Sequence, residues 1–455
     1  MCVLLGLRAL AGSILHAQTG DAGTSHGPAV SVMPPGQLRG SSPPLLPTSA
    51  TTPENVLFGG LGIAAVYDDN IAITNGQPRG GFLYSLTPDM TLQQTRPNRT
   101  LDLNFVGGLT MAQHDRLVNN GTQGTAALAA EYQQLLGPHI LLTSKQKLLK
   151  TNNPFGDAEP GEPVSTTSAA ELNASSGVPT ATRTSFVSDE AIIYQFSRHA
   201  SVGIDGSYST LRLRDVAGTA GGNATLIDGR TASGGFFYAV EISRDHKIGA
   251  EYQVQDMRFD GGVARTQDNA LFLFDEIRLT SSMTLALYAG PDYVHVHNNI
   301  LTPNSGGRPQ VLPFVDDLWF PSGGASYTWR GKRVALGLSG SSLVTDGAGA
   351  TGSMQALTSS VELRKDFGKR WTATSGFGYA RSHLIEGSTT GAASRITTEQ
   401  PSLSLVHRLS TQVTLDAQYA YLWQHGGGAI VPFVTGNHHR ASMSLLYQFA
   451  KPLGR

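Results

Sequence analysis

Two pairs of histidines have a spacing that could place imidazoles close together for metal binding. His295 and His297 alternate with valines in YVHVHNN, so a strand would carry both rings on one face. His438 and His439 are adjacent near the outer end of another expected strand. A metal site needs three or four ligands in a closed geometry, and a pair supplies two. We therefore expect both pairs at a polar rim and assign no metal or other cofactor.

Motifs for nucleotide binding and hydrolysis are missing from the sequence. The glycine-rich stretches GTAGG at 218–222 and GGGA at 426–429 have neither a following Lys-Ser/Thr nor a βαβ context, so we interpret them as flexible loops. The sequence contains no G-x-S-x-G elbow and no H-E-x-x-H motif, and no Ser–His pair is marked by spacing. The prediction is a protein that is not an enzyme.

Isolated charges inside alternating segments are better candidates for function. They occupy the polar face of segments whose other face is apolar. In a dry core such groups would be costly unless paired, whereas a water-filled lumen would hydrate them. They could therefore set the selectivity of a channel, or they could simply pair across its wall without a selective role. The candidates are Asp102, Asp205, Glu251, Glu362, Arg364, Arg408 and Asp416.

The segments that carry these charges alternate with a period of two from Leu57 onward, and helical periodicity is scarce. In VTLDAQYAYLW at 413–423, valine, leucine, alanine and aromatic residues take one face, and mainly polar residues take the other. Segments 100–110 and 247–254 repeat the scheme. Several segments exceed ten residues, the length of a tilted transmembrane strand, whereas soluble strands average five or six.

Connections between these segments alternate in length. Eight are short, such as LGP at 136–138 and GK at 368–369, and nine are longer and polar. This arrangement is typical of outer-membrane barrels and predicts 18 antiparallel strands. The count treats Phe82–Gln94 as one strand with a bulge at Pro88, because proline cannot donate to a ladder. The predicted fold class is all-β, a transmembrane up-and-down β-barrel.

Composition and the N-terminal region agree with an exported barrel. Charged residues make up 15 % and formal net charge is -1, which argues against a nucleic-acid partner. Residues 1–17 resemble a secretory signal, and 18–56 are rich in Pro, Ser, Gly and Thr, as in a disordered tether. The barrel is expected over 57–455. No run approaches 18 consecutive apolar residues, so no transmembrane helix is expected.

The end of the chain, SMSLLYQFAKPLGR, resembles the assembly signal of bacterial outer-membrane proteins. The matching positions are Ser442, Ser444, Tyr447 and Phe449. The sequence departs from the usual pattern in having Ser444 where glycine is common and in the six-residue tail after Phe449. The resemblance implies the barrel-assembly machinery as a partner and the bacterial outer membrane, with its lipid, as the location.

A wider resemblance covers about 57–455. VYDDNIAI at 66–73, the segment at 82–109 and the units FSRHASVGI and ISRDHKIGA are similar to the beta-barrel porin 2 group of outer-membrane barrels. Several members of that group are encoded beside exopolysaccharide export systems. The resemblance implies fold and location, and it raises polysaccharide-export components as partners.

Three functions remain open from the sequence. The first is a channel for small solutes or an accessory of polysaccharide export. The second is a structural or adhesive barrel that presents the segment 150–184 as a surface, and the third is a soluble secreted all-β protein. The sequence does not specify a solute, a gate or an oligomeric state.

Overall fold

The computed structural model describes residues 54–69, 80–112, 122–151, 182–214, 228–259, 264–303, 309–345, 353–385, 395–427 and 436–453. The proposed signal segment, most of the tether and most of the 150–184 segment lie outside these residues. In the described part of the chain, no helix is long and apolar enough to cross a membrane. All regular structure there is β-strand.

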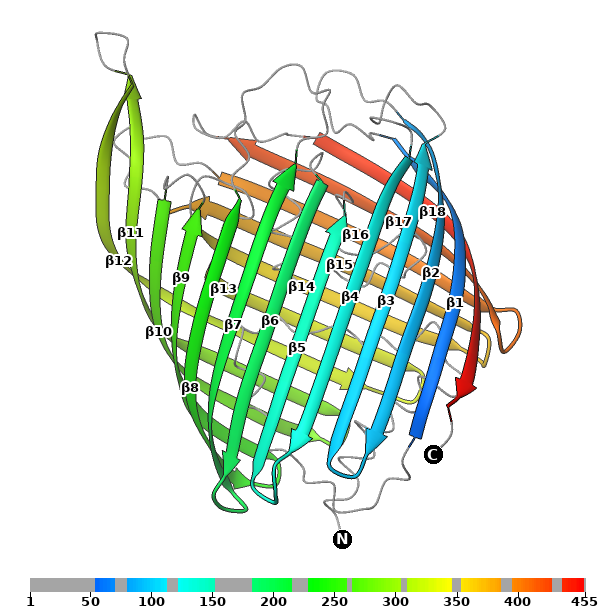
Figure 1. Cartoon of the computed structure of the whole chain (residues 1–455), viewed down its shortest axis with the longest axis horizontal. Coiled ribbons are helices and arrows are strands. Elements are labelled where there is room, and N and C mark those ends of the chain that lie inside the picture. Colours follow the sequence, from blue (N-terminus) through cyan, green and yellow to red (C-terminus); the bar gives the residue numbers. More distant parts are fainter. Residues whose placement is uncertain are drawn as a thin grey trace.

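Eighteen antiparallel strands form a single closed sheet (Figure 1). Each strand pairs with its neighbours in the chain, and β1 pairs with β18 over 13 residue pairs from Val56↔Pro452 to Asp68↔Arg440. The strands are β1 (Glu54–Asp68), β2 (Gly81–Arg96), β3 (Arg99–Ala112), β4 (Thr122–Leu135), β5 (Ile140–Thr151), β6 (Thr182–Gln195), β7 (Ala200–Arg214), β8 (Gly229–Ser243), β9 (His246–Phe259), β10 (Ala264–Thr280), β11 (Met283–Pro303), β12 (Pro309–Arg330), β13 (Val334–Thr345), β14 (Met354–Phe367), β15 (Trp371–Leu384), β16 (Arg395–Arg408), β17 (Val413–Gly427) and β18 (Gly436–Pro452).

The predicted number of strands is confirmed, but the prediction of a bulge at Pro88 is wrong. β2 is one strand in unbroken register with β1, where Pro88 lies opposite Leu61. On the β3 side, Leu86↔Leu109 and Asp89↔Val106 share one register, and only Thr87 and Pro88 lack partners. The missing N–H of Pro88 therefore interrupts the ladder locally without adding a residue.

The eight expected short turns join the strands at one end of the barrel, and the long connections lie at the other end. Two of these turns contain a glycine with positive φ, Gly137 at 83° and Gly368 at 74°, a conformation that residues with a side chain rarely adopt. We call the two ends the short-turn end and the long-loop end.

One pair of strands extends past the long-loop end (Figure 1). β11 and β12 stay paired as far as Pro303↔Pro309, although a loop was expected over 299–318. β12 pairs with β13 only from Gly323 to Arg330, so its outer half is held by β11 alone. The expectation failed because two extended segments pair with each other without any other strand.

Candidate functional site: the barrel interior

The outer surface of the barrel is apolar around its circumference. Alternate residues of each strand are exposed and largely hydrophobic, such as Leu61 and Ile63 on β1 or Met443, Leu445 and Tyr447 on β18. The opposite set points inward and is mainly small or polar. Closure pairs the strands with one another around the whole circumference, apart from the β11–β12 extension, and such pairing is what a bilayer requires of a β-structure. An even number of long strands, short turns at one end and an apolar outer face define the bacterial outer-membrane class.

The chain is an outer-membrane β-barrel. Aromatic residues point outward towards the two ends of the strands, where they suit the interfacial girdles of a membrane barrel: Tyr67, Tyr208, Trp319, Trp329, Trp371, Tyr379 and Trp423. Four lie in ring pairs on the outer face, among them Tyr67 with Phe82 at 5.3 Å and Trp319 with Tyr293 at 5.1 Å between centroids. The apolar belt between the girdles contacts lipid, so function that involves solutes must be sought inside.

All seven charges that were considered for the lumen occupy inward positions. Exposed hydrophobic neighbours fix this orientation, for example Ile204 before Asp205 and Tyr252 after Glu251. The surroundings of three of them, however, differ from the water-filled lumen that was expected. Glu251 is only 1 % exposed, and Glu362 and Asp416 are also buried. Their selectivity role therefore cannot be general, because groups this deeply buried do not face open water.

The dry part of the interior lies between β8–β11 and β13–β15. One cluster joins Met257 of β9 and Val294 of β11 to Val344 of β13 and Ile385 after β15. Ser353, just before β14, lies 3.8 Å from the sulfur of Met257, five strands away. The inner surfaces of strands on facing walls thus contact each other, and they exclude water from this side.

A second apolar cluster extends from this side to β6 and β5. It contains Ile193, Phe237, Ala239, Ala270, Phe272, Phe274 and Tyr288, with Leu141 and Leu343 packed against it. Phe237 lies opposite Gly203 in the β7–β8 register, and a Cβ on Gly203 would fall 2.3 Å from its ring. Large inward aromatic residues therefore fill the space that glycine leaves.

Some buried polar side chains of β13–β17 bond to each other across strands. The hydroxyls of Ser339 and Ser360 are 2.6 Å apart, and those of Ser341 and Thr358 are 2.7 Å apart, on β13 and β14. Ser404 donates to Asp416 at 3.1 Å, and Gln418 also donates to that carboxylate. Asp416 is therefore a member of a buried hydrogen-bonded network, which explains how a carboxylate is tolerated there.

A more exposed part of the interior lies against the middle of β3–β6, although Leu149 and Arg183 nearer the long-loop end and Ile193 nearer the short-turn end are buried. One cross-strand row passes through Asp102, Glu131, Lys145 and Asp189, which are register partners in succession. The Lys145 ammonium lies 3.0 Å from a Glu131 oxygen, and these side chains remain 54 % and 42 % exposed although they point inward. We call these four residues the charged row.

Three members of the charged row were missed from the sequence, namely Glu131, Lys145 and Asp189. Their segments alternate less clearly, because β4 is rich in alanine and β5 has polar residues on both faces. The signal was nevertheless available. Asp102 is inward, and antiparallel pairing of consecutive strands brings these residues to its level.

The histidine pairs are not brought together. His295 and His297 point outward on β11, and His295 lies 2.6 Å from Asp317 of β12. His439 is also outward and bonds Tyr419 at 2.7 Å. His438 is inward, buried, and paired with Asp68 where the barrel closes. Asp68, Asp69 and His438 place one possible ligand atom each within 4.8 Å, the one such group among the described residues.

The four assembly-signal candidates lie on β18, which pairs with both β17 and β1. Ser442 and Ser444 point inward, whereas Tyr447 and Phe449 are exposed on the outer face. A Cβ on Gly59 of β1 would lie 2.6 Å from the ring of Phe449, so that aromatic covers the glycine opposite it. Recognition of these residues by the assembly machinery stays a prediction.

No protein-family model matches the chain, and no curated protein matches it in sequence. Several solved structures are similar in fold. The ferric-catecholate import receptor Fiu of E. coli K12 has 9 % identity and a TM-score of 0.43, covering 86 % of this chain and 81 % of its own. OpdK of Pseudomonas aeruginosa with vanillate has 10 % identity and a TM-score of 0.41, covering 87 % and 99 %. OccAB2 of Acinetobacter baumannii has 11 % identity and a TM-score of 0.43, covering 86 % and 98 %.

Proposed function

We propose that the protein is a channel that lets small hydrated solutes cross the outer membrane along the β3–β6 side of its lumen. The single observation that carries this proposal is the exposure of Lys145 and Glu131 inside a closed barrel. Exposed charges need water, and an 18-strand barrel is wide enough to contain an aqueous passage. The dry packing of β8–β11 against β13–β15 narrows that passage to one side.

The charged row also predicts which sign of ion the proposed channel prefers. It holds three carboxylates and one lysine, and Lys147 is the next inward residue of β5. Carboxylates therefore outnumber cationic groups within the charged row itself, whereas Lys147 and the buried Arg183 of β6 balance them over the whole β3–β6 wall. Rings of acidic side chains favour cations in channels, so we expect cations and neutral polar solutes to pass more readily than anions.

Planar-bilayer recording of the purified protein tests the proposal. We expect discrete conductance steps and a reversal potential in a salt gradient that shows cation preference. Replacing Asp102 and Asp189 by Asn should lower that preference, because both carboxylates belong to the charged row. The matched control is Glu362→Gln, which removes an inward carboxylate from the dry side and should leave the reversal potential unchanged.

A folded protein without conductance steps would overturn the proposal of a channel. It would favour the alternative of a structural or adhesive barrel that presents a surface. One feature suits that second function, since the paired β11–β12 extension reaches past the long-loop end. A role beside polysaccharide export rests on the sequence resemblance alone. Reduced surface polysaccharide in a deletion strain, restored by the intact gene, would support it.

A further inference from the structure

A group of arginines lies on the outer face of the barrel near its long-loop end. Arg258 of β9 is the register partner of Arg230 on β8 and of Arg265 on β10. Arg212 follows Thr210 on β7, and Thr210 is the partner of Arg230. Four successive strands thus each contribute one outward arginine. We call Arg212, Arg230, Arg258 and Arg265 the arginine cluster.

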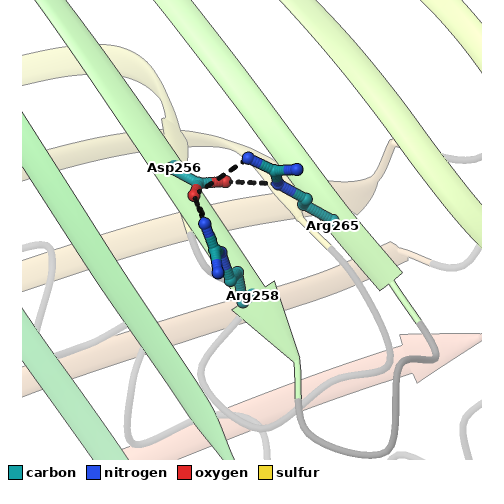
Figure 2. A network of polar contacts seen from close by, with 3 residues as sticks. All are labelled: Asp256, Arg258 and Arg265. Atoms are coloured by element: carbon teal, nitrogen blue, oxygen red, sulfur yellow. Dashed lines mark hydrogen bonds and ion pairs between the residues drawn. The ribbon is translucent and has the colours of Figure 1, made fainter.

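One carboxylate orients two of these side chains, as Figure 2 shows. Asp256 accepts from Nε of Arg258 at 2.8 Å and lies 2.6 Å from its Nη2. It also accepts from Nε of Arg265 at 2.8 Å and from its Nη2 at 3.2 Å. Both guanidinium groups are thereby fixed side by side, and each has five N–H donors, more than these bonds use.

The arginine cluster carries a surplus of positive charge. Asp256 lies between Arg258 and Arg265, and Asp228 comes just before β8. Four guanidinium groups therefore outnumber two carboxylates. Along the rim, Asp317 of β12 is already bonded by Tyr293 and His295, so it does not neutralise the cluster.

The level of the cluster places it beside lipid head groups. Below it, past Gln267 and Asn269 on β10, the outer face becomes apolar at Tyr208, Phe236, Val254 and Leu271, which are all exposed. Arg258 is four residues beyond Val254 on β9, about 13 Å along the strand at roughly 3.3 Å per residue. Strand tilt shortens this height, and arginine can extend its side chain towards the interface. The guanidinium groups consequently lie just outside the hydrocarbon core.

We propose that the arginine cluster binds the phosphate of a lipid head group in the leaflet around the long-loop end. Paired guanidinium groups match phosphate oxygens in geometry and charge, and arginine forms bidentate bonds to phosphate. The adjoining apolar belt would hold the acyl chains of the same lipid. This site lies on the outside of the wall and is independent of the proposed channel.

Native mass spectrometry of the full chain in detergent tests the proposal with three probes. These are phosphatidic acid, diacylglycerol with the same acyl chains, and inorganic phosphate. We expect phosphatidic acid to bind at least about five-fold more tightly than either other probe, because charge and anchoring act together. The double variant R258Q/R265Q should lose about that factor. The control R244Q/R333Q, with both changes in short turns at the opposite end, should bind normally.

Unchanged binding of phosphatidic acid by R258Q/R265Q would overturn the proposal that the arginine cluster binds a lipid phosphate. Equal binding of diacylglycerol would show that the apolar belt alone holds lipid, and equal binding of inorganic phosphate would show a free-anion site. Heat-dependent gel mobility reports whether each variant is folded. If the double variant does not fold, the single variants R258Q and R265Q replace it, and each should bind phosphatidic acid at least about three-fold more weakly.

Discussion

The ammonium of Lys145 lies 3.0 Å from the carboxylate of Glu131 inside the barrel, between Asp102 and Asp189 in the charged row. Both side chains keep about half of their surface exposed to water. An ion pair in such surroundings contributes little to stability, about 0–1 kcal/mol. Its main consequence is electrostatic, because Lys145 partly offsets the negative charge of the three carboxylates in the charged row.

Lys145→Gln should therefore increase cation preference. The substitution removes the one positive group of the charged row and leaves its three carboxylates. The reversal potential in a salt gradient should move towards the value of a channel that passes only cations. This change is opposite to the one expected for the variant with Asn at positions 102 and 189. Lys332→Gln, in the short turn after β12, is the control, and an equal shift there would contradict the assignment.

Two adjacent phenylalanines allow the dry interior to be tested. Phe237 is 0 % exposed and points inward, whereas Phe236 is 51 % exposed on the outer face. Phe237→Ala should lower the free energy of unfolding by about 3–5 kcal/mol, because it leaves a cavity. Phe236→Ala should cost less, since it opens no cavity, and equal losses would contradict the dry packing. The measurement is equilibrium urea unfolding in lipid.

Gly203→Val should destabilise the same region from the other side of the contact. The Cβ of any residue at this position would lie 2.3 Å from the Phe237 ring, so the ring must move into the second apolar cluster. Overpacking of this kind costs about 1–3 kcal/mol. In the double variant, Phe237→Ala should make room for the valine at position 203, so the loss of unfolding free energy should be smaller than the sum of the two single losses. Losses that simply add would exclude direct contact between positions 203 and 237.

Depth in the membrane should decide the cost of a charge on β18. Leu445 lies in the middle of the outward apolar face, and Asn437 lies on the same face near the long-loop end. Leu445→Arg should destabilise the barrel by about 2–4 kcal/mol and Asn437→Arg by about 0–1 kcal/mol. Similar costs at both positions, measured by unfolding in lipid vesicles, would contradict the different membrane depths assigned to Leu445 and Asn437.

The contact at the closure of the barrel should contribute to stability. His438 is inward and buried with Asp68 across the β1–β18 pair. Asp68→Ala removes the carboxylate partner of a buried imidazole and should cost about 1–3 kcal/mol. The temperature at which the folded gel band disappears should fall. His439→Ala, on the exposed face of the same strand, should change that temperature much less.

Much of the fold was predictable because strand alternation is local. The inward position of Asp416 and the outward position of Leu415 follow from the sequence around them, and so does the number of strands once short and long connections are separated. The extended β11–β12 pair was not predictable, since no local pattern indicates that a segment will lack a partner on one side.

The sequence by itself determined the number of strands in this barrel. Where alternation is clear, it also determined which residues face inward and which face outward, because side chains of a strand alternate with a period of two. Only the tertiary structure decided that Glu251 and Glu362 are dry while Glu131 and Lys145 are wet. All four are charged residues, so residue type does not distinguish the dry pair from the wet pair. Their hydration depends on which wall of the cylinder lies opposite, and that distance is set by side chains many strands away.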